Sequence, residues 1–229
     1  MTDLSLWTPP PLPPRAPIRG RYITLEPLEQ AHVAGLIEAH AEDATGEMWR
    51  YLAVGPFEGD GYAAWVAENG GLPDPLHYAI RMQDGRLGGT LALMRITPAA
   101  GSIEAGWLTF APRLQRTREA TEAVTLLVRW AFEAGYRRFE WKCDAANLPS
   151  RRAAQRFGFS YEGVFRQAGV VKGRNRDTAW FAAIDGEWPA LQSAYEAWLA
   201  PENFDGGGRQ RQALSDLTAP ILVARDPAL

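Results

Sequence analysis

The chain has 229 residues, 46% of them hydrophobic and 22% charged, which is typical of one globular domain with short appended segments. Its 24 basic and 27 acidic side chains give a net charge of −3 without long single-sign runs, which argues against nucleic acid as a partner. No signal-peptide pattern or 18-residue apolar stretch occurs, so we expect a cytoplasmic protein with no membrane partner. A single cysteine, Cys143, excludes an internal disulfide and a thiolate zinc cluster.

Residues 1–20 are rich in proline and are expected to form an extended arm along the surface. A short strand over 22–27 then ends at a proline, and apolar residues at helical spacing predict a helix over about 33–41. A further short helix is expected near 61–69. Three strands joined as an antiparallel meander follow, over 76–83, 86–96 and 102–110.

The second half alternates helices and strands. One apolar face predicts a long helix over about 119–134 that Gly135 ends, and a half-buried strand over 138–144 leads into a short helix that ends at Gly158-Phe159. Two strands split by a turn at Lys172-Gly173 and a last helix complete the domain, over 159–168, 177–184 and 187–199. Beyond them, 200–229 contains Gly206-Gly207-Gly208 and is expected to be a flexible tail.

Arginine is concentrated where a predicted strand leads into the long helix. Only Lys142 and Lys172 are lysines, and the loop Pro112–Thr121 carries three of the 22 arginines. The N-terminus of a helix presents free backbone N–H groups, and arginine binds phosphate in bidentate fashion, so this junction indicates a phosphate site. The alternative is that Thr117 or Thr121 only caps the helix and the arginines are solvated.

A second motif runs from Asp144 to Phe159, where a strand end leads into an arginine-rich helix. With Gln115–Thr121, it resembles the GCN5-related N-acetyltransferase (GNAT) superfamily, and most closely the ribosomal-protein-alanine acetyltransferase (RimJ/RimL) type. The resemblance extends to Glu162–Arg166 and Arg176–Thr178 and covers Arg21 to Leu199. It implies an α/β (α+β) fold whose mixed, mostly antiparallel central sheet is splayed, with helices on both faces.

The resemblance also implies a binding site for acetyl-CoA as cosubstrate, without a metal. The pyrophosphate would lie on the loop amides and the pantetheine between strands 102–110 and 138–144, with a backbone N–H near Thr109 facing the developing oxyanion. Asn147 is either a hydrogen-bond partner of pantetheine or a helix cap. The cofactor-binding candidates are Thr109, Gln115, Arg116, Thr117, Arg118, Glu119, Ala120, Thr121, Asn147 and Arg152.

Three positions depart from the pattern of the family. Arg118 stands where the loop usually has glycine, so we expect ordinary backbone angles and an outward side chain there. Ala154 stands where many members have a tyrosine acid, and Gly169 stands where related enzymes have a glutamate base. Ser150 is the candidate proton donor, although it could also serve only the first turn of its helix.

Replacement bases can be sought among nearby carboxylates. Glu104 is the candidate catalytic residue, and Asp144 and Glu162 are further possibilities, although such carboxylates are more often solvated or ion-paired. The three histidines show no metal-ligand spacing, and Cys143 fits a packed residue better than an acyl-carrying nucleophile. Three tryptophans could line an acceptor pocket, namely Trp49, Trp65 and Trp107.

We therefore expect transfer of an acetyl group from acetyl-CoA to a primary amine, a protein N-terminal α-amine or a weakly basic small amine, by direct attack in a ternary complex. One alternative is a small-molecule acetyltransferase acting on a polyamine, amino acid or amino sugar. Another is an inactive acyl-CoA-binding module, suggested by the missing tyrosine and glutamate, and a third is an interaction protein. A homodimer is possible.

Overall fold

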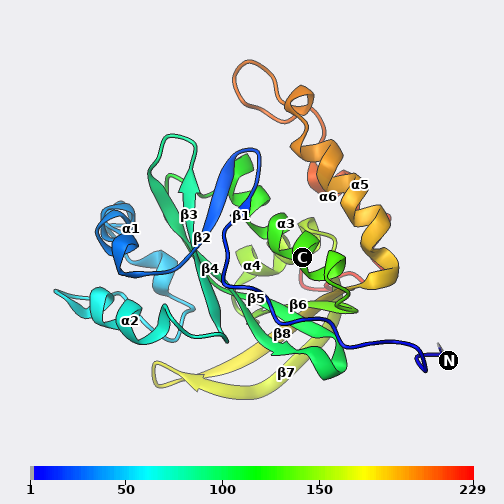
Figure 1. The fold of residues 1–229 in the computed structure, drawn as a ribbon, viewed down its shortest axis with the longest axis horizontal. Helices are drawn as coiled ribbons and strands as arrows, with labels where there is room; N and C mark the ends of the chain where they lie inside the picture. Colours follow the sequence, from blue (N-terminus) through cyan, green and yellow to red (C-terminus); the bar gives the residue numbers. More distant parts are fainter. Residues whose placement is uncertain (1–2) are drawn as a thin grey trace.

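A computed structural model describes residues 3–229 (Figure 1). Within these residues the sheet has eight strands in the order β1-β2-β3-β4-β5-β6-β8-β7. The strands are β1 Ile18–Arg19, β2 Ile23–Pro27, β3 Leu76–Met82, β4 Leu87–Thr97, β5 Ser102–Phe110, β6 Arg138–Asp144, β7 Ser160–Val171 and β8 Arg174–Ile184. The helices are α1 Val33–His40, α2 Gly61–Asn69, α3 Arg118–Glu133, α4 Leu148–Arg156, α5 Trp188–Leu199 and α6 Leu214–Thr218.

All neighbouring strands are antiparallel except β5 and β6, which are parallel. A parallel pair needs a crossover connection, and the long helix α3 provides it. The sheet is therefore mixed and mostly antiparallel with helices on both faces, which confirms the fold class expected from the sequence.

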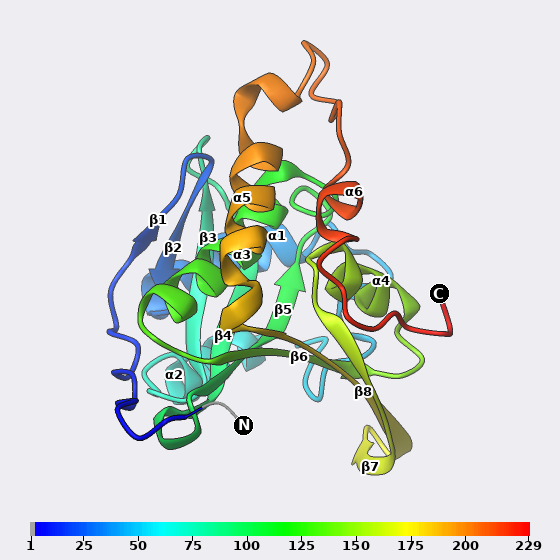
Figure 2. The ribbon, with the colours of Figure 1, turned by 90° about the vertical axis from the view of Figure 1, so that its right-hand side faces the viewer.

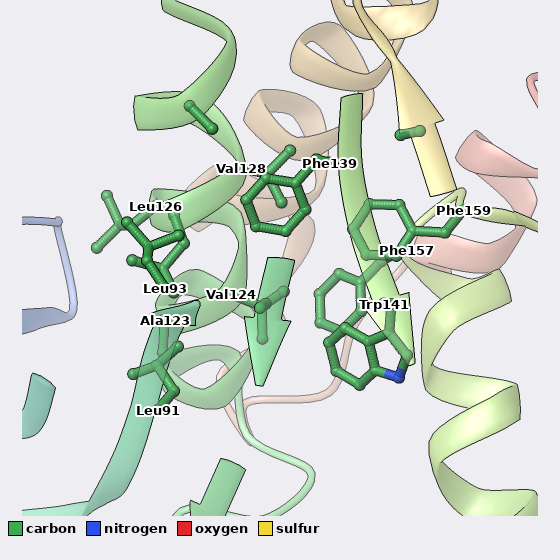
Figure 3. Packing of buried hydrophobic residues seen from close by; sticks show 14 of the residues in the cluster. Leu91, Leu93, Ala123, Val124, Leu126, Val128, Phe139, Trp141, Phe157 and Phe159 are labelled. Atoms are coloured by element: carbon green, nitrogen blue, oxygen red, sulfur yellow. The ribbon is translucent and has the colours of Figure 1, made fainter. Parts of the chain in front are cut away.

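The helices cover the two faces unequally (Figure 2). Helices α3 and α5 lie against one face with α4 and α6 beside them, whereas α1 and α2 lie against the other. The larger core lies under α3, where Val124 and Val128 approach Leu93 of β4 and Phe139 of β6 (Figure 3). The apolar positions of α3 recur at helical spacing, so burial of this face explains why the helix forms here.

The parallel strands β5 and β6 separate along their length. Their pairing runs from Ser102–Arg138 to Ala105–Trp141 and stops there, although both strands continue. On the other side of β5, Trp107 and Leu108 together lie opposite the single residue Leu91, and Trp107 has a φ of 53°. An extra residue of this kind bends a strand. The bend of β5 coincides with the point where β5 and β6 stop pairing, so their facing edges are left without partners from each other.

The terminal segments pack more closely than their composition suggests. In the arm, Arg15 donates hydrogen bonds to the carbonyls of Leu28 and Gly70 at 2.6 Å each. The flexible tail expected over 200–229 is wrong for its second half, because Leu214 of α6 is fully buried. Asp226 is also buried and accepts two hydrogen bonds of 2.6 Å from Arg151 on α4.

Candidate active site

The loop between β5 and α3 is built as a helix start with a capping side chain. The Thr117 hydroxyl accepts the backbone N–H of Ala120 at 3.1 Å and donates to the carbonyl of Leu114 at 2.6 Å. Gln115 donates its amide to the carbonyl of Phe110 at 2.7 Å, which closes the loop onto the end of β5. The first turn of α3 therefore faces the open end of β5 with backbone N–H groups of the kind that bind phosphate oxygens.

Arg113 belongs to the scaffold of this loop. Its guanidinium contacts the carboxylates of Glu42 at 2.6 Å and Glu38 at 3.0 Å, both from α1 or just after it. These contacts hold the pKa of Glu42 below its usual value, since the ionised carboxylate accepts both side-chain and backbone hydrogen bonds from Arg113. The charge of Arg113 is thus already matched by protein carboxylates.

The other two loop arginines occupy different positions. Arg116 is exposed and has a φ of 62°, so the left-handed residue of the loop is Arg116, while Arg118 begins α3 in helical conformation. The Arg118 guanidinium lies over the ring of Tyr22 at 4.6 Å and that of Phe204 at 5.5 Å, with Glu119 at 3.7 Å. Arg118 therefore has the ordinary backbone angles expected for it, and its side chain is held over two aromatic rings.

Helix α4 adds an arginine that sequence reasoning missed. Arg156 is half-buried, stacks on Trp198 at 4.9 Å and donates to the Thr121 hydroxyl of α3 at 3.2 Å. Burial lowers the pKa of Arg156. It joins the first turns of α3 to the end of α4, whereas Arg152 is exposed on α4. The sequence offers one signal for Arg156 as a site residue, its position in an arginine-rich helix.

Ser150 lies on the first turn of α4 beside the end of β6. Its hydroxyl oxygen accepts the indole N–H of Trp141 at 3.0 Å, and the nitrogen of Trp141 points toward α4 in Figure 3. The Asn147 side chain caps the helix by accepting the Ser150 backbone N–H at 3.1 Å. With its oxygen accepting this hydrogen bond, the Ser150 hydroxyl can act as a donor through its own proton, and the Cys143 sulfur is one group near it.

Two residues near Ser150, Cys143 and Ala154, do not compete with it for the role of proton donor or nucleophile. Burial raises the pKa of the Cys143 thiol to about 11, against smaller opposing effects of the Ser150 hydroxyl and nearby arginines. The thiol thus stays protonated near neutral pH, which fits a packed residue rather than a nucleophile. Ala154 is fully buried in the core, so the family's tyrosine position carries no donor here.

Each carboxylate considered as a base accepts at least one hydrogen bond or ion pair. Glu104 is buried and contacts Arg95 at 2.8 Å and Lys142 at 2.9 Å, and burial raises its pKa while both cations oppose this. Asp144 accepts the backbone N–H of Ala146 at 2.8 Å. Glu162 forms a bidentate ion pair with Arg138. Arg95 and Lys142 hold the Glu104 carboxylate in two ion pairs, so this occupied geometry disfavours the catalytic role expected for Glu104.

Thr109 lies where β5 faces β4. Its hydroxyl is 2.5 Å from that of Thr90 and accepts the Thr90 backbone N–H at 3.2 Å. The side chain is thus occupied within the sheet, and any role toward an oxyanion belongs to the backbone of this strand end.

Aromatic side chains gather on the face of the sheet that α1 and α2 cover. Trp65 lies 5.1 Å from His77 and 6.0 Å from Trp107. Trp49 joins the same group through Tyr62, whose ring lies 6.5 Å from Trp49 and 5.8 Å from Trp65. The ring of His40 lies 4.9 Å from Trp49. Burial lowers the pKa of His40 and of His77 to about 4, so both imidazoles are neutral at pH 7. The three tryptophans named from the sequence therefore share one aromatic group.

The loop 49–55, in the N-terminal half of the chain, contacts both the β7–β8 hairpin and the turn before α4. The Lys172 ammonium at the hairpin tip donates to the carbonyls of Gly55 at 2.6 Å and Trp49 at 2.9 Å. Tyr51 donates its hydroxyl to the carbonyl of Ala146 at 3.2 Å, in the turn before α4. The loop 49–55 thus bridges the hairpin and the serine-bearing helix.

The site thus combines a parallel strand pair that separates, a helix start that carries arginines, and a serine on the next helix. A comparison with protein families identifies the family that has this sequence pattern. The model of the acetyltransferase (GNAT) domain matches residues 23–160 of the chain. The chain belongs to the GNAT acetyltransferase family. It is therefore an N-acetyltransferase, and the family implies the use of acetyl-CoA.

Solved structures of GNAT proteins agree with this assignment. A GCN5-related N-acetyltransferase from Brucella melitensis is 46% identical, with a TM-score of 0.92, and the match covers 94% of this chain and 100% of that one. A protein assigned to the GNAT family from Chromobacterium violaceum is 43% identical, with a TM-score of 0.77 and coverage of 83% and 96%. RimL, a ribosomal L7/L12 α-N-protein acetyltransferase, shares the fold at 24% identity, a TM-score of 0.64 and coverage of 76% and 99%.

A sequence comparison with curated proteins gave no match. Over the described residues 3–229, no group of three or more His, Cys, Asp or Glu side chains is arranged to hold a metal ion. In the same part of the acetyltransferase, no helix is long and apolar enough to cross a membrane.

Proposed function

We propose that this acetyltransferase moves the acetyl group of acetyl-CoA to a weakly basic primary amine by direct transfer in a ternary complex, with Ser150 as the proton donor. The observation that carries the proposal is the hydrogen bond from Trp141 to Ser150 at the open end of β6. The N–H groups at the start of α3, with Arg116 and Arg118, would hold the pyrophosphate, and Asn147 and Arg152 lie on the neighbouring helix.

Ser150 fits the role of the donor for a physical reason. The N–H of Trp141 donates to the hydroxyl oxygen, which stabilises that oxygen when its proton leaves toward the departing thiolate. Backbone N–H groups at the end of β5 near Thr109 would face the charge that develops on the thioester oxygen.

The class of amine follows from the state of the carboxylates. Glu104 is held by two cations, and the family's base position is Gly169, so neither of these two positions supplies a free carboxylate. An α-amine with a pKa near 7.7–8.0 is partly neutral at pH 7, whereas a lysine-type amine near 10.4 is almost fully protonated. A weakly basic amine can therefore attack without help from a strong base.

The experiment follows thiol release from acetyl-CoA across a panel of peptides with free N-termini, small amines, polyamines and amino sugars. Sustained turnover with a weakly basic amine is expected, with kcat/KM rising with pH along the acceptor's own titration. A profile flat from pH 6 to 9, with chemistry rate-limiting, would contradict the missing-base argument. Binding of CoA without turnover of any amine would instead indicate an acyl-CoA-binding module.

A further inference from the structure

Arg156 on α4 is a half-buried arginine whose charge no carboxylate balances. Within residues 3–229 it makes no ion pair, and its side-chain hydrogen bond goes to the neutral hydroxyl of Thr121 at 3.2 Å. Burial lowers the pKa of Arg156, and the opposing effect comes from the hydroxyl of Tyr195 rather than from an acidic residue. A charge taken out of water without a counter-ion costs free energy, so this guanidinium points to an anionic ligand.

Arg118, the first residue of α3, is in a similar state. In the described part of the chain, the one carboxylate within 4 Å of its guanidinium is that of Glu119 at 3.7 Å, which is too long for a hydrogen bond. By contrast, Arg113 and Arg151 each contact a carboxylate oxygen at 2.6 Å. The guanidiniums of Arg118 and Arg156 therefore keep N–H groups that no carboxylate of the described residues holds.

Aromatic rings in contact with each other hold both guanidiniums in place. Arg118 lies 5.5 Å from the ring of Phe204, and Arg156 lies 4.9 Å from the ring of Trp198. The rings of Phe204 and Trp198 meet edge to face at 5.1 Å, and the indole N–H of Trp198 donates to the side chain of Gln210 at 2.8 Å. A ring against the face of a guanidinium leaves its in-plane N–H groups free to donate, so these contacts orient the arginines without neutralising them.

Both arginines lie at the start of α3. The Thr121 hydroxyl, which accepts the hydrogen bond from Arg156, lies one turn after the helix cap Thr117 and donates to its carbonyl at 3.3 Å. Arg118 follows the cap directly. The two guanidiniums are thus joined to the first turns of the helix whose free backbone N–H groups suit phosphate oxygens.

We propose that Arg156 is a further ligand for a phosphate group of acetyl-CoA, acting with Arg118, and that Trp198 and Phe204 position the two guanidiniums. The inference rests on the proposed function and extends its cosubstrate site from the loop before α3 to the end of α4. Arginine donates two parallel hydrogen bonds to phosphate oxygens, and the phosphate would supply the missing negative charge.

The positioning residues come from a part of the chain that the family pattern does not include. The model of the acetyltransferase domain matches residues 23–160, whereas Trp198 lies on α5 and Phe204 lies in the segment between α5 and α6 (Figure 2). This segment would therefore contribute to cosubstrate affinity through side chains that act on the arginines.

The first test measures binding of CoA and of dephospho-CoA directly, without an acceptor. Arg156→Met keeps the length of the side chain and removes its charge, and it should raise the Kd for CoA about ten- to a hundredfold. An equal rise for dephospho-CoA would assign Arg156 to the pyrophosphate, and a rise for CoA alone would assign it to the 3′-phosphate. Arg129→Met, at an exposed position on α3, is the matched control and should leave both Kd values unchanged.

The melting temperature of the unliganded variant separates a ligand from a structural residue. Because the charge of Arg156 has no counter-ion, Arg156→Met should not lower the melting temperature of the chain without CoA. At a fixed CoA concentration, the rise in melting temperature should be smaller than in the wild-type chain. A lower melting temperature without CoA, together with an unchanged Kd, would make Arg156 a structural residue and overturn the inference.

Phe204→Leu tests the positioning role. This variant should raise the Kd for CoA about two- to fivefold, as the loss of a contact between arginine and an aromatic ring predicts. In an Arg118→Met background it should cause no further rise, because the arginine that Phe204 positions is gone. Additive rises in Kd would show that Phe204 acts independently of Arg118 and would overturn this part of the inference.

An unchanged Kd for both ligands in Arg156→Met would overturn the role of Arg156 as a ligand. The proposed function would remain intact in that case if the wild-type chain binds CoA and acetylates an amine. A wild-type chain that binds neither CoA nor dephospho-CoA would refute the proposed function and this inference with it.

Discussion

Replacing Asp226 with alanine should destabilise the fold strongly. Its carboxylate is fully buried and accepts two hydrogen bonds of 2.6 Å from Arg151, whose side chain is 8% exposed. Removing one partner of a buried ion pair leaves an uncompensated charge and costs about 3–5 kcal/mol. In a domain of this size 1 kcal/mol corresponds to about 2–4 °C, so the melting temperature should fall by about 6–20 °C.

Urea unfolding at constant m-value measures this loss. Asp216→Ala is the matched control, since Asp216 lies exposed on α6 in the same tail, and it should change stability by no more than about 0.5 kcal/mol. Exchanging Arg151 and Asp226 together for methionine and leucine should cost less than Asp226→Ala alone, because no unpaired charge remains. If Asp226→Ala loses no more stability than the control, the tail is not held by this pair.

Three further changes test the site and its surroundings. Ser150→Ala should lower kcat about a hundredfold with little change in CoA affinity. Trp141→Phe should lower kcat in the wild-type chain but cause no further loss in the Ser150→Ala background. Additive losses of kcat would show that the two side chains act independently. Replacing Arg116 and Arg118 with alanine should weaken CoA about ten- to a hundredfold, and more than dephospho-CoA if either contacts the 3′-phosphate, whereas unchanged affinities for both ligands would make these arginines solvated residues. The pKa of His77, about 4 against an ordinary 6.5, means that the unfolded chain takes up a proton first as pH falls. His77 should therefore contribute a drop of up to about 1.4 kcal/mol per pH unit in the free energy of unfolding between pH 6.5 and 4, and His40 a similar one. The slope should be less steep in His77→Phe by the contribution of one histidine, and parallel slopes would refute this.

Local patterns were sufficient to predict most elements. The alternation of Phe139, Trp141 and Cys143 with polar residues predicts a strand over 138–144, and β6 has those bounds with the alternate residues buried. The same holds for α3, because a long apolar face leaves few alternatives, and for the Lys172-Gly173 turn between β7 and β8. Periodicity reports burial directly, so these elements need no tertiary information.

The contacts that define the site depend on residues far apart in sequence. Arg113 looks like a phosphate ligand within its loop, yet its partners Glu38 and Glu42 lie more than 70 residues earlier. Glu104 looks like a free carboxylate on its strand, yet Arg95 and Lys142 occupy it from two neighbouring strands. Composition and spacing carry no information on such pairing, so the type of side chain could be predicted but not its availability.

The distance of 75 residues between Arg151 and Asp226 has a consequence during synthesis of the chain. At about 5–20 residues per second, the arginine emerges roughly 4–15 s before its partner exists. During that interval the Arg151 guanidinium lacks its carboxylate partner, although its hydrogen bond to the Ala145 carbonyl needs no later residue. The contact that joins the tail to α4, the helix that bears Ser150, can thus form only after nearly all of the residues described here have been translated.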